Sequence, residues 1–271
     1  MRPFSLATLA TLATAAAAFT TFATDASASS AQLDAAGVAR LEALRESPES
    51  AGALIYRGAV FAQGKADVAP LFTYERRVAR APDGMSSAHV TRDPSGDVII
   101  VEQARFTAGY ALQRFDATNR QLGYSGSVVL SNGGRHLEYR LNQNGEVSTA
   151  SEDVSDPVVS GPSLHGFILH HWDALAQGGS MAVRMIVMTN KETFGFQIRR
   201  LAQPEGRTSF SITPSHLLVR LAVAPLVVTF DSTTRNVIRY EGCVPPMQVD
   251  GGDLRNLDAR VDYSMNVTTY R

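Results

Sequence analysis

Cysteine is nearly absent from this chain of 271 residues, in which Cys243 is the only one. A single cysteine excludes an internal disulfide, and a chain of this length can bury enough core to fold without one. It also excludes zinc and redox motifs that need paired cysteines. Because no charged group that could activate it is apparent nearby, Cys243 is expected to be a small, near-buried residue.

Lysine is also scarce: Lys65 and Lys191 are the only two among 25 basic residues, and the formal net charge is −1. This charge balance gives no general attraction to nucleic acid or to an anionic membrane. Long apolar runs are missing beyond the N-terminal region, since Arg220 and Pro225 interrupt the most apolar later segment, residues 217–230. We therefore expect no nucleic-acid partner and no stable membrane span once the leader is removed. The sequence predicts no particular oligomeric state.

Catalytic motifs are missing as well. The sequence has no H-E-x-x-H, no glycine-rich phosphate loop and no complete G-x-S-x-G elbow, because Gly123-Tyr124-Ser125-Gly126 lacks the second spacer. The sequence thus favours a non-catalytic protein, and no cofactor and no metal are expected.

The N-terminal residues, by contrast, contain the pattern of an export signal. Arg2 is the only charge before Asp25, residues 6–22 are rich in Leu, Ala, Thr and Phe, and Ala26-Ser27-Ala28 offers small residues for cleavage. This pattern is typical of a secretory signal peptide over residues 1–28. No cysteine follows it, so a lipid anchor is not expected, and the location predicted is the periplasm or the outside of a bacterium. Residues 29–50 are expected to be a flexible lead-in, although Leu33, Leu41 and Leu44 form one weak helical face.

Residues 51–271 are expected to form a single β-rich domain. Short apolar segments alternate with turn residues, as in Asp93-Pro94-Ser95-Gly96, Asn142-Gln143-Asn144-Gly145 and Asp231-Ser232-Thr233-Thr234. In the first of these, aspartate can bond its own downstream backbone, proline presets φ, and glycine takes a positive φ. Strands at this spacing indicate antiparallel hairpins.

One helix stands out. Leu164, Phe167, Ile168, His171, Trp172 and Leu175 lie on one helical face, and Gly178-Gly179 ends the pattern. A second, short helix is expected over residues 215–222. Helices inserted between runs of strands predict an α+β fold: a curled antiparallel sheet of about ten strands, an incomplete barrel, with the long helix and the short one packed on its concave face.

Titratable side chains on these elements were weighed as sites. His170 and Asp173 have the spacing of a pair, but a solvated helix pair is favoured, and the three helix histidines diverge too far for a metal. Several arginines lie on expected strands, and a solvent-facing role is favoured for them over a ladder that binds an anion. If the strands are regular, however, one member of Arg76-Arg77 and one of Arg199-Arg200 points inward and needs a partner. The strand arginines are Arg57, Arg76, Arg77, Arg184, Arg199 and Arg200.

Two C-terminal stretches, residues 167–175 and residues 217–231 with Ile238-Arg239-Tyr240-Glu241-Gly242, resemble a group of uncharacterised secreted proteobacterial proteins. The arrangement is also distantly similar to the periplasmic lipoprotein-carrier (LolA/LolB-like) superfamily. That resemblance implies an incomplete barrel with an apolar cavity plugged by helices, but fold alone does not define function.

The favoured function is therefore that of an exported, non-catalytic protein that binds or carries an apolar or lipid-like ligand. The expected ligand-binding residues are Phe167, Ile168, Trp172, Met185 and Val187. The alternatives are an envelope structural or interaction protein, in which the same residues form a filled core, and a hydrolase with an unrecognised site.

Export gives the first testable prediction. In a bacterial host that secretes proteins, the mature chain should begin close to residue 29, as N-terminal sequencing of the periplasmic or secreted protein would reveal. A membrane-bound product that still begins at Met1 would contradict it.

Overall fold

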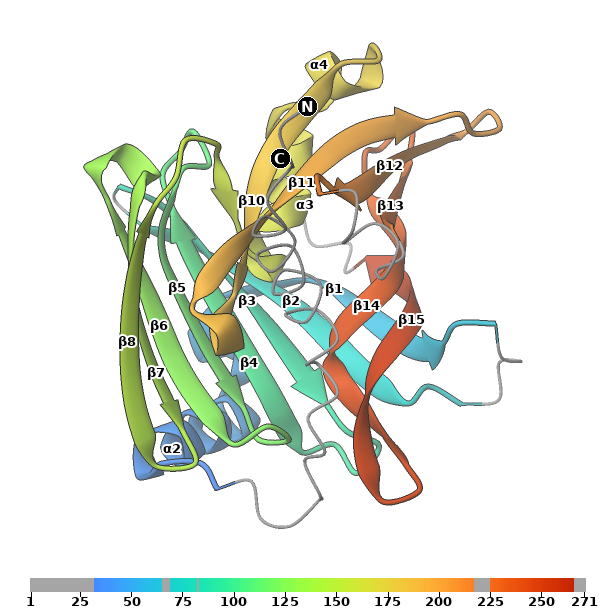
Figure 1. Cartoon of the computed structure of the whole chain (residues 1–271). Coiled ribbons are helices and arrows are strands. Elements are labelled where there is room, and N and C mark those ends of the chain that lie inside the picture. The colour runs from blue at the N-terminus through green and yellow to red at the C-terminus, as the bar shows by residue number, and fades with distance from the viewer. Residues whose placement is uncertain (1–31, 65–68, 82, 217–224, 266–271) are drawn as a thin grey trace, which may run out of the picture.

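The computed structural model describes residues 32–64, 69–81, 83–216 and 225–265, which form one long antiparallel meander with a few helices (Figure 1). Its strands are β1 (Ala53–Ala62), β2 (Phe72–Ala81), β3 (Gly84–Arg92), β4 (Val98–Phe106), β5 (Leu112–Asn119), β6 (Tyr124–Ser131), β7 (His136–Gln143), β8 (Glu146–Asp153), β9 (Val158–Val159), β10 (Ser180–Val187), β11 (Glu192–Leu201), β12 (Arg207–Pro214), β13 (Leu226–Asp231), β14 (Val237–Asp250) and β15 (Asp253–Met265). The helices are α2 (Ala35–Glu46), α3 (Gly161–His170) and α4 (Trp172–Ala176), with short 3₁₀ turns η2 (Pro48–Ala51), η3 (Asn132–Gly134) and η4 (Met188–Asn190).

All strands belong to one open sheet in the order β8-β7-β6-β5-β4-β3-β2-β1-β15-β14-β13-β12-β11-β10-β9. Pairing is antiparallel except between β9 and β10. The prediction of a mostly antiparallel, open sheet is confirmed, but the number of strands was wrong: the sheet has 15 strands and not about ten. The excess arises because each short apolar segment forms a separate strand of its own and all of them pair into a single sheet.

The expected hairpin turns are present. Asp93 Oδ1 accepts hydrogen bonds from the backbone N–H groups of Ser95 and Asp97, both at 3.0 Å, between β3 and β4. Gly96 then adopts a φ of +92°, which an L side chain rarely takes. Asp231 Oδ1 caps the β13–β14 turn in the same way, accepting from the Thr233 and Thr234 N–H groups. Local side-chain chemistry therefore sets where these strands begin and end.

Part of the expected flexible lead-in is a helix. The side chain of Asp34 caps α2 by accepting the Gly37 N–H at 2.7 Å. Leu41 and Leu44 are buried on Val90 and Val101, which face outward from β3 and β4. We call this side of the sheet the outer face. The weak leucine stripe is therefore sufficient when a sheet is available to cover it.

Helix α3 packs on the opposite, inner face of the sheet (Figure 1). Phe167 and Ile168 are buried there, and Trp172 contacts the rings of Phe210 and Phe230 edge-on, each at 5.4 Å between centroids. The predicted single helix is interrupted at His171, so Trp172 begins the separate helix α4. The periodicity of the sequence does not reveal this break, at which His171 leaves the helical conformation with a φ of −101° and a ψ of 18°. The second helix, expected at residues 215–222, falls largely outside the described residues.

Side chains connect the two ends of the sheet where no strand ladder does. Glu152 on β8 accepts hydrogen bonds from Tyr139 at 2.5 Å and from Thr193 on β11 at 3.1 Å. Arg184 on β10 donates to Thr193 Oγ1 at 2.6 Å. The tip of the β10–β11 hairpin packs its Met188 among β5, β6 and β7. The sheet therefore curls back on itself but stays open.

Within the described part of the chain, the helices are too short or too polar to cross a lipid bilayer.

Trp172 is only 6% exposed, so its burial yields a stability prediction. Replacing it with alanine should lower the free energy of unfolding by about 3–5 kcal/mol, because the change leaves a cavity between Phe210 and Phe230. Leu169→Ala on the neighbouring turn, where the side chain is exposed, should cost less than about 1 kcal/mol. Denaturant unfolding followed by circular dichroism measures both. Equal losses would show that Trp172 is not a core residue.

Candidate functional site

Four polar side chains form a row across the inner face of β1, β2, β3 and β4. Tyr56 lies opposite Arg76, Arg76 opposite His89, and His89 opposite Glu102. Neighbours on antiparallel strands point to the same side, so all four face the interior. We call Tyr56, Arg76, His89 and Glu102 the polar row.

The N-terminus of α3 sits on the polar row. Arg76 Nη1 donates to the Pro162 carbonyl at 2.6 Å, and the Ser87 hydroxyl donates to the same oxygen. Gly161 allows this close approach: a side chain there would come 3.2 Å from a Glu102 carboxyl oxygen. Further along the helix, His165 Nδ1 shares a hydrogen bond of 2.6 Å with the Tyr56 hydroxyl. The row therefore anchors the start of the helix with buried hydrogen bonds.

Burial controls the charges in this region. Desolvation lowers the pKa of His89 well below its ordinary value and that of His165 to about 3, and the nearby Arg76 guanidinium lowers both further. Desolvation also raises the pKa of Glu102 to about 7. Both histidines are thus neutral at physiological pH, and Glu102 is close to the midpoint of its titration. Arg76 is the permanent charge of the polar row.

Next to the row is a wall of three tyrosines, Tyr74, Tyr240 and Tyr263, which we call the tyrosine wall. Gly58 lies directly opposite both Tyr74 and Tyr263, and having no side chain it leaves room for the Tyr263 ring. Each tyrosine is half-buried, yet desolvation raises the pKa of each hydroxyl well above its ordinary value. These are inward-facing rings that keep some accessible surface.

The five residues expected to bind a ligand do not have equivalent positions. Phe167, Ile168 and Trp172 are almost fully buried in the core around α3, whereas Met185 and Val187 on β10 are half-buried. The structure brings the first three together with Met185 in one cluster but does not include Val187 in it. Their role as ligand contacts remains a prediction.

The expected solvent-facing role of the strand arginines is wrong for two of them. Arg57, Arg199 and Arg200 are exposed and Arg184 is half-buried, but Arg76 and Arg77 are 6% and 7% exposed. Arg76 points inward, and Arg77 pairs on the outer face with Glu75 at 3.0 Å. The inference that one member points inward is confirmed for Arg76-Arg77 but is wrong for Arg199-Arg200, both of which are exposed.

Other candidate groups are dispersed. Asp173 pairs with Arg235 at 3.2 Å and not with His170, whose ring instead lies against those of Tyr110 and His171. Cys243 is exposed, contrary to the expected near-buried position, because it alternates with the inward Gly242 on β14. Within the described ranges, no three His, Cys, Asp or Glu side chains are grouped so that they could hold a metal.

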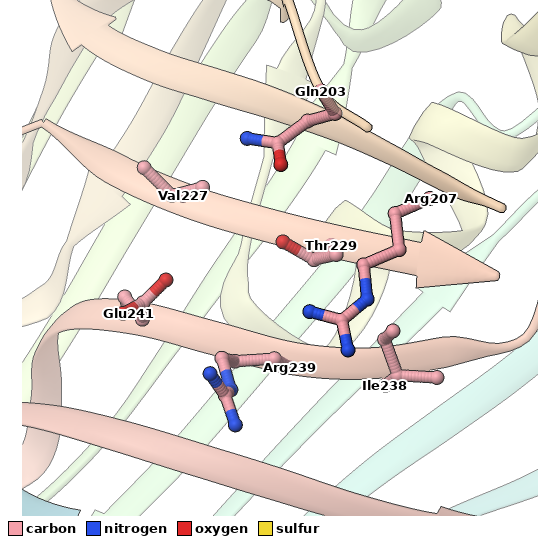
Figure 2. Close-up of a pocket in the computed structure, with 7 residues that line it drawn as sticks. All are labelled: Gln203, Arg207, Val227, Thr229, Ile238, Arg239 and Glu241. Carbon is pink, nitrogen blue, oxygen red and sulfur yellow. The ribbon is translucent and has the colours of Figure 1, made fainter. Parts of the chain in front are cut away.

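A depression of about 350 Å³ lies on the outer face of β12, β13 and β14 (Figure 2). It is lined by Gln203, Arg207, Val227, Thr229, Ile238, Arg239 and Glu241. Arg239 is already paired with Asp262 at 2.7 Å, and Thr229 bonds with Ser209. Mixed charges with internal partners make this depression a weaker candidate site than the interior.

Sequence reasoning missed most of the interior site. It singled out Arg76 but not Tyr56, His89 or Glu102 of the polar row, nor the tyrosine wall. A usable pattern did exist: polar residues stand at inward positions of strands whose other inward residues are apolar. Recognising it requires the strand register, because a shift of one residue reverses the two faces.

No family model and no curated protein matches this chain. Among solved structures, it is similar to a β-barrel-like protein of the domain of unknown function DUF1849 from Brucella abortus, with 11% identity, coverage of 79% of this chain and 99% of that one, and a TM-score of 0.41. A porin-like protein from Bacteroides uniformis shows 8% identity, 78% and 86% coverage and a TM-score of 0.20. Scores this low do not establish a shared fold or function.

Glu102 gives a prediction about pH. Its pKa rises from 4.5 in the unfolded chain to about 7 in the fold, so the native state holds the proton more tightly. Stability linked to this group is present below pH 4.5 and is lost as the pH rises through 7, by up to about 3 kcal/mol. Glu102→Gln removes that loss and should exceed the wild type in stability at pH 8 but not at pH 4. Denaturant unfolding at both pH values, which measures the free energy of unfolding, tests this.

Glu42→Gln, at an exposed position on α2, is the matched control and should follow the wild type at both pH values. If Glu102→Gln and Glu42→Gln have the same pH profile, the Glu102 carboxyl is not desolvated.

Proposed function

We propose that this protein is an exported, non-catalytic binding or carrier protein that holds an apolar or lipid-like ligand inside its incomplete barrel. One observation carries the proposal. Tyr74, Tyr240 and Tyr263 face the interior and pack on a common apolar cluster, yet remain half-buried. Large inward rings that the described residues do not fully cover are suited to contact an apolar ligand.

The neighbourhood of the tyrosine wall agrees with this proposal. Val244 on β14 and Met265 on β15 also point inward and are half-buried. Phe167, Ile168 and Trp172 are almost fully buried in a core cluster against which these tyrosines also pack, so they have little surface left for a ligand. We place the ligand against the accessible surface of the tyrosine wall. Met185 and Val187 remain proposed contacts at the edge of this space.

The second candidate function is that of an envelope interaction or structural protein. The dense packing of Phe167 and Trp172 against Phe210 and Phe230 favours it, since a filled core needs no ligand. It differs from the first proposal in one measurable respect: the interior would take up no apolar molecule.

Binding of N-phenylnaphthylamine, an uncharged dye that fluoresces in apolar sites, separates the two functions. The wild type should bind the dye. Val244→Trp should weaken binding about tenfold or more, because an indole would fill the space beside the wall. Val249→Trp is the matched control on the same strand, where the valine is 68% exposed, and should bind as the wild type does.

Circular dichroism must show that both variants are folded. Absence of dye binding by the wild type, or equal binding by the two variants, would contradict the carrier proposal. Native mass spectrometry of protein purified from its own host would extend the test, because a co-purified lipid would identify the class of ligand directly.

A further inference from the structure

Arg76 is a buried cation without a buried anion. Arg76 is only 6% exposed, and among the described residues no carboxylate oxygen lies within ion-pair distance of its guanidinium. Its partners among the described residues are the Pro162 carbonyl, the His89 ring at 3.3 Å and the Tyr56 side chain, whose hydroxyl it hydrogen-bonds and whose ring centroid is 6.0 Å from the guanidinium carbon. The adjacent Arg77, on the other face, is paired with Glu75. A buried charge normally has a partner of opposite sign.

The nearest acid does not neutralise Arg76. Glu102 lies two positions along the polar row, with His89 between them. Among the described residues none donates a hydrogen bond to the Glu102 carboxyl, and desolvation raises the pKa of this carboxyl to about 7. His89 and His165 add no negative charge. Among the described residues, Arg76 therefore has no ion-pair partner beside the tyrosine wall.

Two hydroxyl groups without acceptors among the described residues lie near this charge. The hydroxyls of Tyr74 and Tyr263 have no acceptor among the described residues, while the Tyr240 hydroxyl of the same wall donates to the Cys243 carbonyl at 2.6 Å. The Tyr74 and Tyr263 rings are 6.2 Å apart, and Arg76 is close enough to oppose the rise in both hydroxyl pKa values. Two hydrogen bonds of Arg76 use Nη1 and a third involves the Tyr56 side chain, so with five N–H groups the guanidinium still has some left to donate.

We propose that the ligand is an amphiphile with a single anionic head group, a carboxylate or a phosphate, which binds to Arg76 and to the hydroxyls of Tyr74 and Tyr263. The head group supplies the missing negative charge and the missing acceptors, and its hydrocarbon tail lies along the apolar inner face near Val244. This inference rests on the proposed function and specifies the chemistry of its ligand.

The test compares oleate with methyl oleate, which has the same chain but no charge, by displacement of N-phenylnaphthylamine from the full mature protein. The wild type should prefer oleate by about tenfold or more, the usual effect of hydrogen bonds to a charged group. The double variant Tyr74→Phe, Tyr263→Phe should lose most of this preference. Tyr240→Phe is the matched control and should keep it, because its hydroxyl already has an acceptor.

Arg76→Gln should also abolish the preference while methyl oleate still binds. Because that change removes an anchor of α3, the tyrosine variants decide the outcome if it does not fold. Dodecyl phosphate and inorganic phosphate form the last comparison: dodecyl phosphate should displace the dye, and inorganic phosphate should not do so at the same concentration.

The failures are distinguishable. If neither oleate nor methyl oleate binds, the proposed function itself fails. If both bind equally to the wild type and to the tyrosine variants, the carrier function stands but the head-group site does not exist. If inorganic phosphate competes as well as dodecyl phosphate, the site takes a free anion and the amphiphile is the wrong ligand.

Discussion

Seven opposed residue pairs join β1 to β15, from Tyr56 opposite Met265 to Ala62 opposite Ala259. This ladder unites the N-terminal meander, β1 to β8, with the C-terminal one, β10 to β15. It makes the first and last strands central and leaves the middle of the chain at the open edges. The segment between β8 and β10, which includes α3, therefore starts at the opening and can enter the curl. Every other feature of the interior depends on this placement.

Once α3 is inside, the N–H groups of its first turn need partners, and the capping box of Ser160 and Ser163 supplies them locally. Arg76 of the polar row and the neighbouring Ser87 then hold the start of the helix by donating to the Pro162 carbonyl. The cost is a buried guanidinium and a carboxyl with a raised pKa on the same face. Buried polar groups that lack some of their hydrogen-bond or charge partners are unusual in a structural core. Their presence on the inner face makes this region the candidate site.

The interior is not uniform. The rings of Trp172, Phe210 and Phe230 pack edge to face and fill the space between α3 and the C-terminal strands. In contact with the same cluster, the three rings of the tyrosine wall keep accessible surface, and Tyr74 and Tyr263 lie close to the charge of Arg76. The interior thus changes from fully buried rings, which stabilise the fold, to half-buried tyrosines. The hydrogen bond between Thr193 on β11 and Glu152 on the edge strand β8 helps to hold the curl, although the sheet stays open.

Local chemistry in the sequence was sufficient to predict the hairpin turns at Asp93 and Asp231, the apolar face of α3, and the ending of α4 near Gly178. These features depend on residues only a few positions apart. The sequence alone did not predict that β1 pairs with β15, that fifteen strands share one sheet, or that Leu41 and Leu44 hold α2 on the outer face. Nor did it predict that Arg76, His89 and Glu102 form one row. Such features depend on strand order and register across distant segments. A shift of one residue would turn the polar row outward and would turn Val90 and Val101, on which α2 packs, inward.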